Sequence, residues 1–459
     1  MSLAMSLPPG PSLPAAVQTY LLIKHTCDFF AYLKLRHGDL FTIRLLGLGP
    51  SVHAARPDLI REMFVAAPER VHAGDSNIVI EPLVGKTSVA LVDEEAHQRV
   101  RRLLNGPLHG QKMRRHAPTI AEATRTAIAE WRPGEQRSML TLMQDVSLEI
   151  ILRVIFGITD RNELPVAAKN VLNMVLAYTA PLVIVPWTRV DLGPMSPGGR
   201  FLRRRQVVND WLLGEVAARR RSPDPERADV LSALVLPKEA GERPFTDQEI
   251  RDQLITLFVA GQDTTSAALT WAMALLHANP KVLERLVAEV DALGPDCDPY
   301  KLADLPYLTA VCQESLRTTT TVPAASRTPV GEPFRLGGFD IPPGTYLSPN
   351  IYLVHHDPSI YPDPHAFVPE RFLEREYSPY EFLPFGGGAR RCIGMALSFL
   401  EMKIVLGTLL RELRFRALTP GMPEHVWRGM VMVPSNQGVL EVTERRVPSG
   451  DKTPFRAAA

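Results

Sequence analysis

The most informative stretch of the chain is FGGGARRCIGMALSFLE, residues 385–401. Three glycines and two arginines lead into Cys392, and the apolar spacing that follows predicts a helix from Ile393 to about Leu410. The N–H groups of a first helical turn and neighbouring guanidinium groups favour an anion, so we expect a low pKa for this thiol. A shielded thiolate that accepts hydrogen bonds is a good ligand for iron.

Two other interpretations of this stretch stay open from its residues alone. Most unpaired cysteines are small buried apolar side chains, and Cys392 would then serve packing only. A glycine-rich loop before a helix also suits a phosphate. The phosphate interpretation is the weaker one, because the GxxxxGK[ST] pattern is missing and no strand-like run leads into the glycines.

Composition is that of a globular protein without a marked charge. The chain has 459 residues, 45% of them hydrophobic, and its formal net charge of +1 gives no sign of a nucleic-acid partner. The proline-rich start, MSLAMSLPPGPSLPAA, lacks the features of a signal peptide, and Val171–Trp187 is too interrupted to span a bilayer. The cysteines show neither zinc-binding nor disulfide spacing. We therefore expect a cytoplasmic protein with no membrane anchor. Its cysteines are Cys27, Cys297, Cys312 and Cys392.

Thr246 begins the best-marked helix of the chain. Thr246 and Glu249 form a capping box, and helical spacing continues to about Ala278, which is roughly 50 Å at 1.5 Å per residue. The middle, LITLFVAGQDTTSAAL, is apolar on nearly all sides and predicts an interior helix.

Poor helix formers gather at the centre of this predicted helix. They are Gly261, Asp263, Thr264 and Thr265, and their low helix propensity in a buried segment favours a functional site. Ala260, Asp263 and Thr264 share a face, where a small side chain leaves room for a flat group beside a hydroxyl and a carboxyl. The alternative is a packing kink in which a nearby arginine binds Asp263.

Two further pairs of charged residues lie on predicted helices. His97 and Arg101 are four residues apart on one face, as donors for a buried carboxylate or as part of a solvated basic surface. Glu314 and Arg317 are three residues apart and able to pair. Arg371, in a proline-rich segment that leads to the cysteine loop, is a candidate to join that second pair.

The rest of the pattern is mostly helical, with short strands. Helical spacing covers Val17–Arg36, Pro57–Phe64, 113–131, 139–157, the Val171 region, Gly199–Arg221 and Leu308–Thr319. Strand-like pieces are Phe334–Leu336, Gly338–Ile341 and Tyr346–Ser348. Two hairpins are expected, Leu40–Leu46 with Val52–Ala54, and a closing hairpin over Val426–Val442 around PSNQG. Residues 68–92 read as a long loop.

Taken together, these motifs resemble the cytochrome P-450 family of haem-thiolate monooxygenases. Phe385–Gly394 match FGxGxRxCxG, Ala260–Thr265 match [AG]Gx[DE]T[TS], Glu314 opens an ExxR motif, and a PERF motif contains Arg371. The motifs occur in family order within residues 93–443. The resemblance implies a mainly α fold with a large helical domain, a long central helix and a small β-rich lobe.

The resemblance also implies the domain organisation and the roles of matching residues. It implies a monomer with one domain over 1–459, whose leader at 1–16 and tail at 444–459 are flexible. Cys392 would be the metal ligand, and Asp263 with Thr264 the catalytic pair that supplies protons during dioxygen activation. The other cofactor-binding positions would be His97, Arg101, Ala260, Arg327, Phe385, Gly386, Arg390 and Gly394. A structural triad without a catalytic role would consist of Glu314, Arg317 and Arg371.

The cofactor implied is haem b (iron protoporphyrin IX), with O2 as co-substrate. The chain holds no flavin or iron–sulfur module, so electrons from NAD(P)H would arrive through a separate ferredoxin or flavodoxin with its reductase. Basic residues near the cysteine would suit such an acidic partner. They are Arg102, Arg391 and Lys403.

The family's substrate-contact regions, among them 72–90 and 171–190, are apolar in this chain. A pocket so lined suits a terpenoid, a steroid or a fatty acyl chain. Its expected lining is Ile78, Val79, Leu83, Leu257, Ala260, Val322 and Val431. The competing functions are a haem-binding sensor or carrier, which does not need the pair Asp263 and Thr264, and a nucleotide-binding protein, which leaves His97 unexplained.

Overall fold

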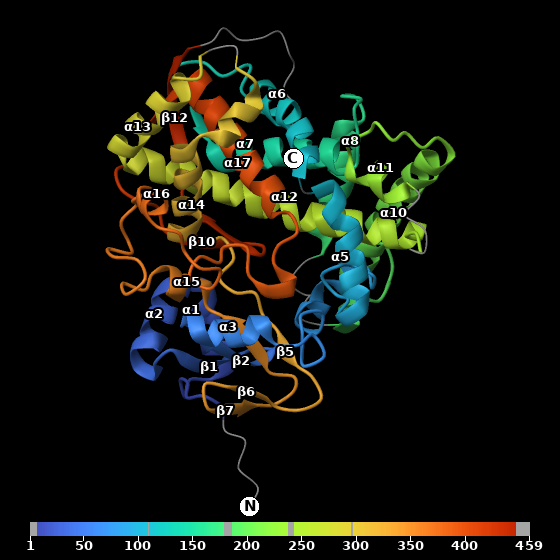
Figure 1. Ribbon diagram of the computed structural model, residues 1–459. Helices are drawn as coiled ribbons and strands as arrows, with labels where there is room; N and C mark the ends of the chain where they lie inside the picture. Colours follow the sequence, from blue (N-terminus) through green and yellow to red (C-terminus); the bar gives the residue numbers. More distant parts are fainter. Residues whose placement is uncertain (1–6, 109, 179–185, 237–242, 295–296, 447–459) are drawn as a thin grey trace, which may run out of the picture.

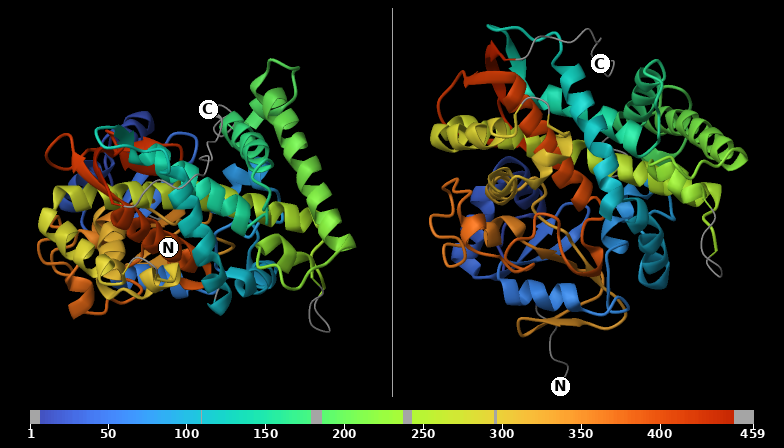
Figure 2. Two further views of the ribbon diagram at one scale, coloured as in Figure 1. Left: turned by 90° about the horizontal axis from the view of Figure 1, so that it is seen from above. Right: turned by 45° about the horizontal axis from the view of Figure 1, so that its top comes forward.

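The computed structural model of the chain describes residues 7–108, 110–178, 186–236, 243–294 and 297–446. The architecture is mainly α, with a large helical body and a smaller β-rich region below it in Figure 1. The β-rich region joins the first strands of the chain, in blue, with a segment from its last third, in orange (Figure 2). The mainly α fold class predicted from the sequence is confirmed.

The helical body is built around α12 (Asp247–Ala278), which crosses it in Figure 1. The Thr246 hydroxyl accepts the Glu249 N–H at 3.1 Å, and the Glu249 carboxylate accepts the Thr246 N–H at 2.7 Å. The capping box and the helix it predicted are therefore confirmed. Most side chains of α12 are buried, as its apolar composition indicated.

Other helices surround α12 and enclose the main core. Those that contact it closely include α7 (Met139–Val154), α10 (Pro197–Arg221), α14 (Pro306–Thr318) and α17 (Met395–Glu412). The remaining helices of the described ranges are α1 (Ala15–Lys24), α2 (Thr26–His37), α3 (Pro57–Val65), α4 (Glu81–Val84), α5 (Glu94–Leu108), α6 (Ala117–Ala127), α8 (Leu164–Ala177), α11 (Val230–Val235), α13 (Pro280–Asp291), α15 (Ile351–His355) and α16 (Arg371–Glu374). Short 3-10 turns are η1 (Asp75–Ile80), η2 (Gly110–His116), η3 (Pro186–Arg189), η4 (Pro299–Asp304) and η5 (Gly388–Arg390). Across the described ranges, no helix combines the length and apolarity that a membrane span requires.

The sheets are small and lie at the edges of the helical body. The predicted first hairpin is present as β1 (Leu40–Leu45) and β2 (Gly49–Ala54), and β8 (Tyr346–Pro349) pairs parallel to β2. The other strands are β3 (Val71–His72), β4 (Gln136–Ser138), β5 (Thr328–Pro329), β6 (Phe334–Leu336), β7 (Phe339–Ile341), β9 (Leu413–Ala417), β10 (His425–Arg428), β11 (Val431–Pro434) and β12 (Val439–Arg445).

The closing hairpin predicted over Val426–Val442 is wrong. β11 pairs with β10, whereas β12 pairs with β4 and β9, so the PSNQG turn joins strands of two different sheets. The pattern identified the strands but not their partners, because β4 comes from a distant part of the sequence.

The helix predicted over Val17–Arg36 is two helices, α1 and α2, separated at His25. The Thr26 hydroxyl donates to the Leu22 carbonyl and accepts the indole N–H of Trp427 at 2.7 Å. Side-chain bonds of this kind compete with regular helical hydrogen bonding.

The described part of the leader predicted over residues 1–16 makes hydrogen bonds to strand β1. The Thr42 N–H donates to the Pro9 carbonyl at 2.9 Å, and its hydroxyl donates to the Pro8 carbonyl at 2.7 Å. Strand β1 therefore holds this segment. Within the predicted tail, β12 continues to Arg445, and residues 447–459 lie outside the described residues.

His53 makes the stability of the β-rich region depend on pH. Its ring is buried, stacks on Phe41 at 5.6 Å and meets the Ser51 hydroxyl at 3.1 Å. Burial lowers the pKa of His53 to about 3. Below about pH 6.5 the His53 imidazole therefore binds a proton in the unfolded chain but not in the folded chain. The free energy of unfolding falls as the pH falls from there toward 3.

Between pH 7 and pH 5 we expect His53 alone to reduce the free energy of unfolding by about 2 kcal/mol. Urea unfolding of the wild type and of His53→Phe at both pH values measures this contribution. The variant should lose about 2 kcal/mol less than the wild type over this interval. His25→Phe, at an exposed position, is the control. Equal pH dependence in wild type and His53→Phe would contradict the prediction.

Candidate functional site

The cysteine loop folds tightly before α17. The Cys392 N–H donates to the Phe385 carbonyl at 2.9 Å, which closes the loop. Gly388 has a φ of +65°, and a Cβ there would meet the carbonyl oxygen of Phe64 at 2.4 Å. Only glycine allows this close approach to α3. The close approach of Phe64 to Gly388 was not predicted, because the two residues lie far apart in the sequence.

Cys392 lies deep in the protein but keeps accessible surface. Burial raises the pKa of its thiol, while the N–H groups of Gly394 and Met395 and the charges of Arg101 and Arg391 act in the opposite direction. The predicted low pKa is therefore wrong for the polypeptide by itself, since the local donors do not outweigh desolvation. The predicted donors at the start of the helix are present.

Four basic side chains form a cluster beside the cysteine loop, which we call the cation cluster: His97, Arg101, Arg327 and Arg390. His97 and Arg327 are buried and Arg101 is half-buried. Among the described residues, the side chains of Arg101 and His97 have no hydrogen-bond partner, and the side chain of Arg327 donates only to backbone carbonyls. Those carbonyls belong to Ala325, Ser326 and Gly387.

The members of the cation cluster repel one another. Burial and the charges of Arg390, Arg101 and Arg327 lower the pKa of His97 to about 4, against the attraction of Asp93. Burial and Arg390 lower the pKa of Arg327 to about 10. A neutral imidazole beside three guanidinium groups makes this a site that requires an anion.

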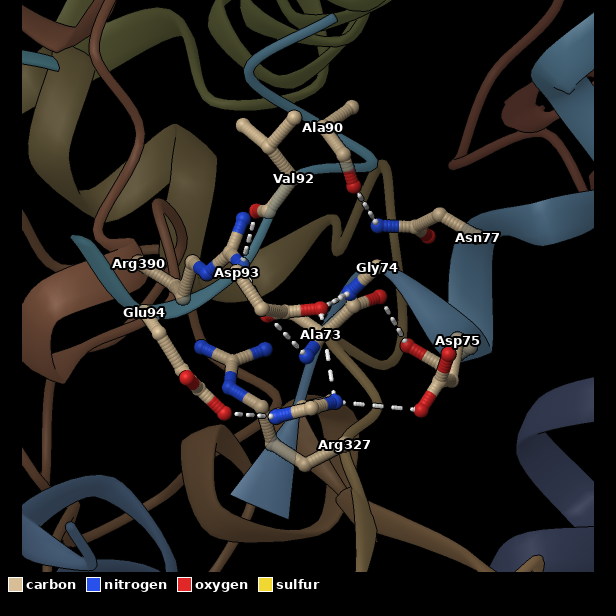
Figure 3. A network of polar contacts seen from close by, with 12 residues as sticks. Ala73, Gly74, Asp75, Asn77, Ala90, Val92, Asp93, Glu94, Arg327 and Arg390 are labelled. Carbon is tan, nitrogen blue, oxygen red and sulfur yellow. Dashed lines mark hydrogen bonds and ion pairs between the residues drawn. The ribbon is translucent and has the colours of Figure 1, made fainter. Parts of the chain in front are cut away.

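Asp93 is the carboxylate nearest to the cluster. Arg390 donates to Asp93 and to the carbonyl of Val92, and the Ala73 and Gly74 N–H groups also donate to Asp93, at 3.0 and 2.9 Å (Figure 3). Arg390, predicted to face the cofactor, is thus bound to the segment before α5. The sequence pattern did not indicate this contact of Asp93.

A second polar group adjoins Asp93. Burial alone would lower the pKa of His72, but the carboxylates of Glu94, Asp93 and Asp75 outweigh it and raise that pKa. The ring lies 2.9 Å from Glu94 and 3.2 Å from Asp75. These contacts tie β3, η1 and the start of α5 together.

Part of the middle of α12 keeps solvent-accessible surface. Ala260 is exposed although the side chains of Leu257 and Thr265 are buried. The Thr264 hydroxyl donates to the Ala260 carbonyl at 2.7 Å. The Thr265 hydroxyl lies 3.2 Å from that of Ser398 on α17, which brings this part of α12 against the helix that follows the cysteine.

Asp263 lies next to Thr264 and is half-buried. Burial raises the pKa of its carboxyl, and the Gln144 amide donates to it at 3.5 Å. The charge of Arg428 acts on Asp263 in the opposite direction, but among the described residues no arginine hydrogen-bonds to it. The raised pKa brings the titration range of this carboxyl closer to neutral pH than that of an exposed aspartate.

Glu314, Arg317 and Arg371 come together in the interior. Arg317 donates to both Glu314 oxygens, at 2.7 and 2.8 Å, and Arg371 donates to Glu314 at 3.1 Å. Arg317 also donates to the carbonyls of His355 and Pro364, at 2.7 Å each. The three residues therefore anchor the irregular segment that leads to the cysteine loop.

The predicted pocket residues differ in their surroundings. Ile78 and Val322 are exposed, and Val79 is half-buried. Leu83 and Val431 are only 3% exposed and belong to packed hydrophobic clusters, so they offer almost no surface to a ligand. The sequence pattern could not separate pocket from core. Residues 179–185 of the predicted lining lie outside the described residues.

Comparison with known proteins identifies the family. Residues 8–442 match the family described as Cytochrome P450. The chain belongs to the cytochrome P450 family. This P450 is 35% identical over 449 residues to cytochrome P450 135B1 of Mycobacterium tuberculosis, covering 96% of this chain and 93% of that protein. It is 34% identical over 461 residues to cytochrome P450 135A1 of the same species, covering 99% of each.

Two solved P450 structures share the fold of this P450. A cyanobacterial CYP120A1 with retinoic acid bound has a TM-score of 0.80 at 24% identity and covers 96% of this chain and 100% of its own. The heme domain of cytochrome P450DA has a TM-score of 0.82 at 20% identity, over 97% and 98%. Family membership makes this P450 a monooxygenase, an oxidoreductase that binds haem and uses O2.

The residues of this P450 fit haem. The cation cluster holds three guanidinium groups with one nearby carboxylate, and haem carries two propionates, which need such donors. Cys392 and Ala260 both keep accessible surface, as contact with a flat group requires. Coordination of a thiol to a metal removes its proton, which offsets the pKa increase that burial causes.

Proposed function

We propose that this P450 inserts one oxygen atom from O2 into a hydrophobic small molecule of the terpenoid, steroid or fatty acyl type. The observation that carries the proposal is the accessible surface kept by Cys392 and by Ala260 beside a cation cluster in which, among the described residues, only Arg390 pairs with a carboxylate. The apolar Ile78, Val79 and Val322 support a hydrophobic substrate.

In this proposal Cys392 holds haem b as its thiolate, and Arg101, Arg327 and His97 bind the propionates. The bound haem supplies the oxidising chemistry, which a thiolate ligand favours by donating electron density. Asp263, whose pKa is raised by burial, would donate a proton to Thr264. Thr264 accepts that proton through its hydroxyl and passes one on toward the reacting oxygen.

The test of the proposal is the absorption spectrum of the dithionite-reduced protein under carbon monoxide. A strongly red-shifted Soret band is expected for thiolate-ligated haem. Protein without haem, or haem without the shifted band, contradicts the proposal.

Thr264→Ala should uncouple electron consumption from product formation. The variant loses the hydroxyl that carries the proton, so the yield of product per electron should fall at least about tenfold. Thr270→Ala is a matched control, since Thr270 makes the same bond to the carbonyl four residues earlier on α12, also at 2.7 Å. Measuring NADH consumed against product formed decides the outcome. Unchanged coupling in Thr264→Ala would remove Thr264 from the mechanism.

The second candidate is a haem-binding sensor or carrier without turnover. The presence of Asp263 and Thr264 on an accessible part of α12 favours the enzyme, because a carrier needs no proton relay. A protein that shows the red-shifted band but forms no product with any electron donor would favour the carrier.

Electrons are proposed to come from NAD(P)H through a ferredoxin or flavodoxin with its reductase, with this P450 as a cytoplasmic monomer. The four free cysteines fit a reducing compartment. Arg391 and Arg102 are exposed. Lys403 is less suited to docking than its position in the sequence indicated, because its ammonium group donates to the Ala303 carbonyl at 2.5 Å.

Arg391→Glu should slow reduction by a [2Fe–2S] ferredoxin about tenfold at low salt and weaken its salt dependence. The reason is that a charge reversal removes attraction to an acidic partner. Stopped-flow reduction at several salt concentrations measures both effects. Arg221→Glu, at an exposed position on α10, is the control. An unchanged rate and salt dependence in Arg391→Glu would place the docking site elsewhere.

A further inference from the structure

Residues 85–93, which we call the strap, connect α4 to α5 and overlap the substrate-contact region 72–90 that the family resemblance implies. The strap is neither helix nor strand. Side chains from other elements bind much of its backbone, which is unusual because most backbone groups pair with other backbone groups. The strap therefore depends on those side chains for its position.

The first turns of α12 hold one side of the strap. The Gln253 amide accepts the Val89 N–H at 2.8 Å and donates to the Thr87 carbonyl at 2.6 Å. Asp252 accepts the N–H and the hydroxyl of Thr87, at 3.1 and 2.7 Å. Gly85, with a φ of +92°, leaves room for the Asp252 carboxylate, which a Cβ there would meet at 2.2 Å.

The cysteine loop holds the other side of the strap. Arg390 donates to the Val89 carbonyl at 2.9 Å and also to the Val92 carbonyl. The peptide groups of Val89 are thus bound from two directions, its N–H by α12 and its carbonyl by the cysteine loop. Gln253 itself is fully buried and makes both of its bonds to the strap.

We propose that Gln253 is a positioning residue that sets the strap, and with it the shape and selectivity of the substrate pocket. The proposal rests on the proposed function, because the strap affects selectivity only if a substrate binds beside it. Gln253 acts through Val89. Its amide binds the Val89 N–H and so fixes the position of the half-buried Val89 side chain. Loss of the amide would leave two backbone groups of the strap without partners.

Hydrogen exchange of the holoprotein, followed by mass spectrometry, tests the positioning role. In Gln253→Leu, amides within residues 85–92 should exchange at least tenfold faster, while peptides of α17 stay unchanged. Gln253→Glu keeps the acceptor for the Val89 N–H and should give a smaller acceleration. Gln206→Leu makes the same change at an exposed position of α10 and should change nothing.

Spectral titrations with lauric acid, a flexible chain, and testosterone, a rigid ring system, test selectivity. The ratio of the two dissociation constants should change at least fivefold in Gln253→Leu and less in Gln253→Glu. Unchanged exchange in the strap, acceleration spread over the whole protein, or faster exchange with an unchanged ratio would each overturn the proposal. If Gln253→Leu does not fold, Gln253→Glu decides by the same two readouts.

The failure of the proposed function has a different signature. Wild-type protein that lacks the red-shifted band, or that binds neither probe, contradicts the proposed function or its substrate class. Strap exchange that is the same in wild type and Gln253→Leu contradicts the positioning role whatever the wild type binds.

Discussion

Cys392→Ser should abolish the red-shifted Soret band and reduce turnover to background. A serine hydroxyl holds its proton far more strongly than a thiol, so the variant cannot supply the thiolate. The backbone bond from residue 392 to the Phe385 carbonyl does not involve the side chain, and we expect the loop to keep its shape. The reduced spectrum under carbon monoxide and the rate of product formation measure the two effects.

Cys27→Ser is the matched control for this prediction. Cys27 is partly buried on α2, and burial raises the pKa of its thiol to about 11. The control removes one thiol outside the cysteine loop and should keep the shifted band. If Cys392→Ser kept the shifted band, Cys392 would not be the ligand.

Glu314→Gln should destabilise the fold by about 3–5 kcal/mol. Glu314 and Arg317 are fully buried, and Arg371 is only 9% exposed. The substitution leaves two buried guanidinium groups without their carboxylate, so the segment that leads to the cysteine loop loses its anchor. Because a native protein is stable by only about 5–15 kcal/mol, we expect a large loss of folded haem-containing protein.

Urea unfolding and the haem content of the purified protein measure the effect of Glu314→Gln. Glu284→Gln makes the same chemical change at an exposed position of α13 and should lie within about 0.5 kcal/mol of the wild type. A Glu314→Gln variant as stable as this control would show that the three charges do not support the fold.

The long central helix was predictable because its signals are local. The capping box at Thr246 and Glu249 lies within one turn, and the apolar residues that follow bury a helix wherever it packs. The same holds for the pair Glu314 and Arg317, whose three-residue spacing places both side chains on one helix face.

Pairings between distant segments were not predictable in the same way. The prediction of a closing hairpin was wrong because β12 pairs with β4 and β9. The alternation of residues within a strand does not indicate which strand it pairs with. The bond between Arg390 and Asp93 joins residues 297 positions apart. No periodicity within either segment indicates it.

By itself, the sequence determined the family, the order of the motifs, the central helix and Cys392 as the expected thiolate ligand. These features depend on residue types at short spacing, which act through local hydrogen bonds and side-chain periodicity. Only the tertiary structure decided that burial raises the pKa of Cys392, that Leu83 and Val431 belong to the core, and that Gln253 holds the strap. The physical reason is that desolvation and side-chain contacts depend on which distant segments the fold brings together.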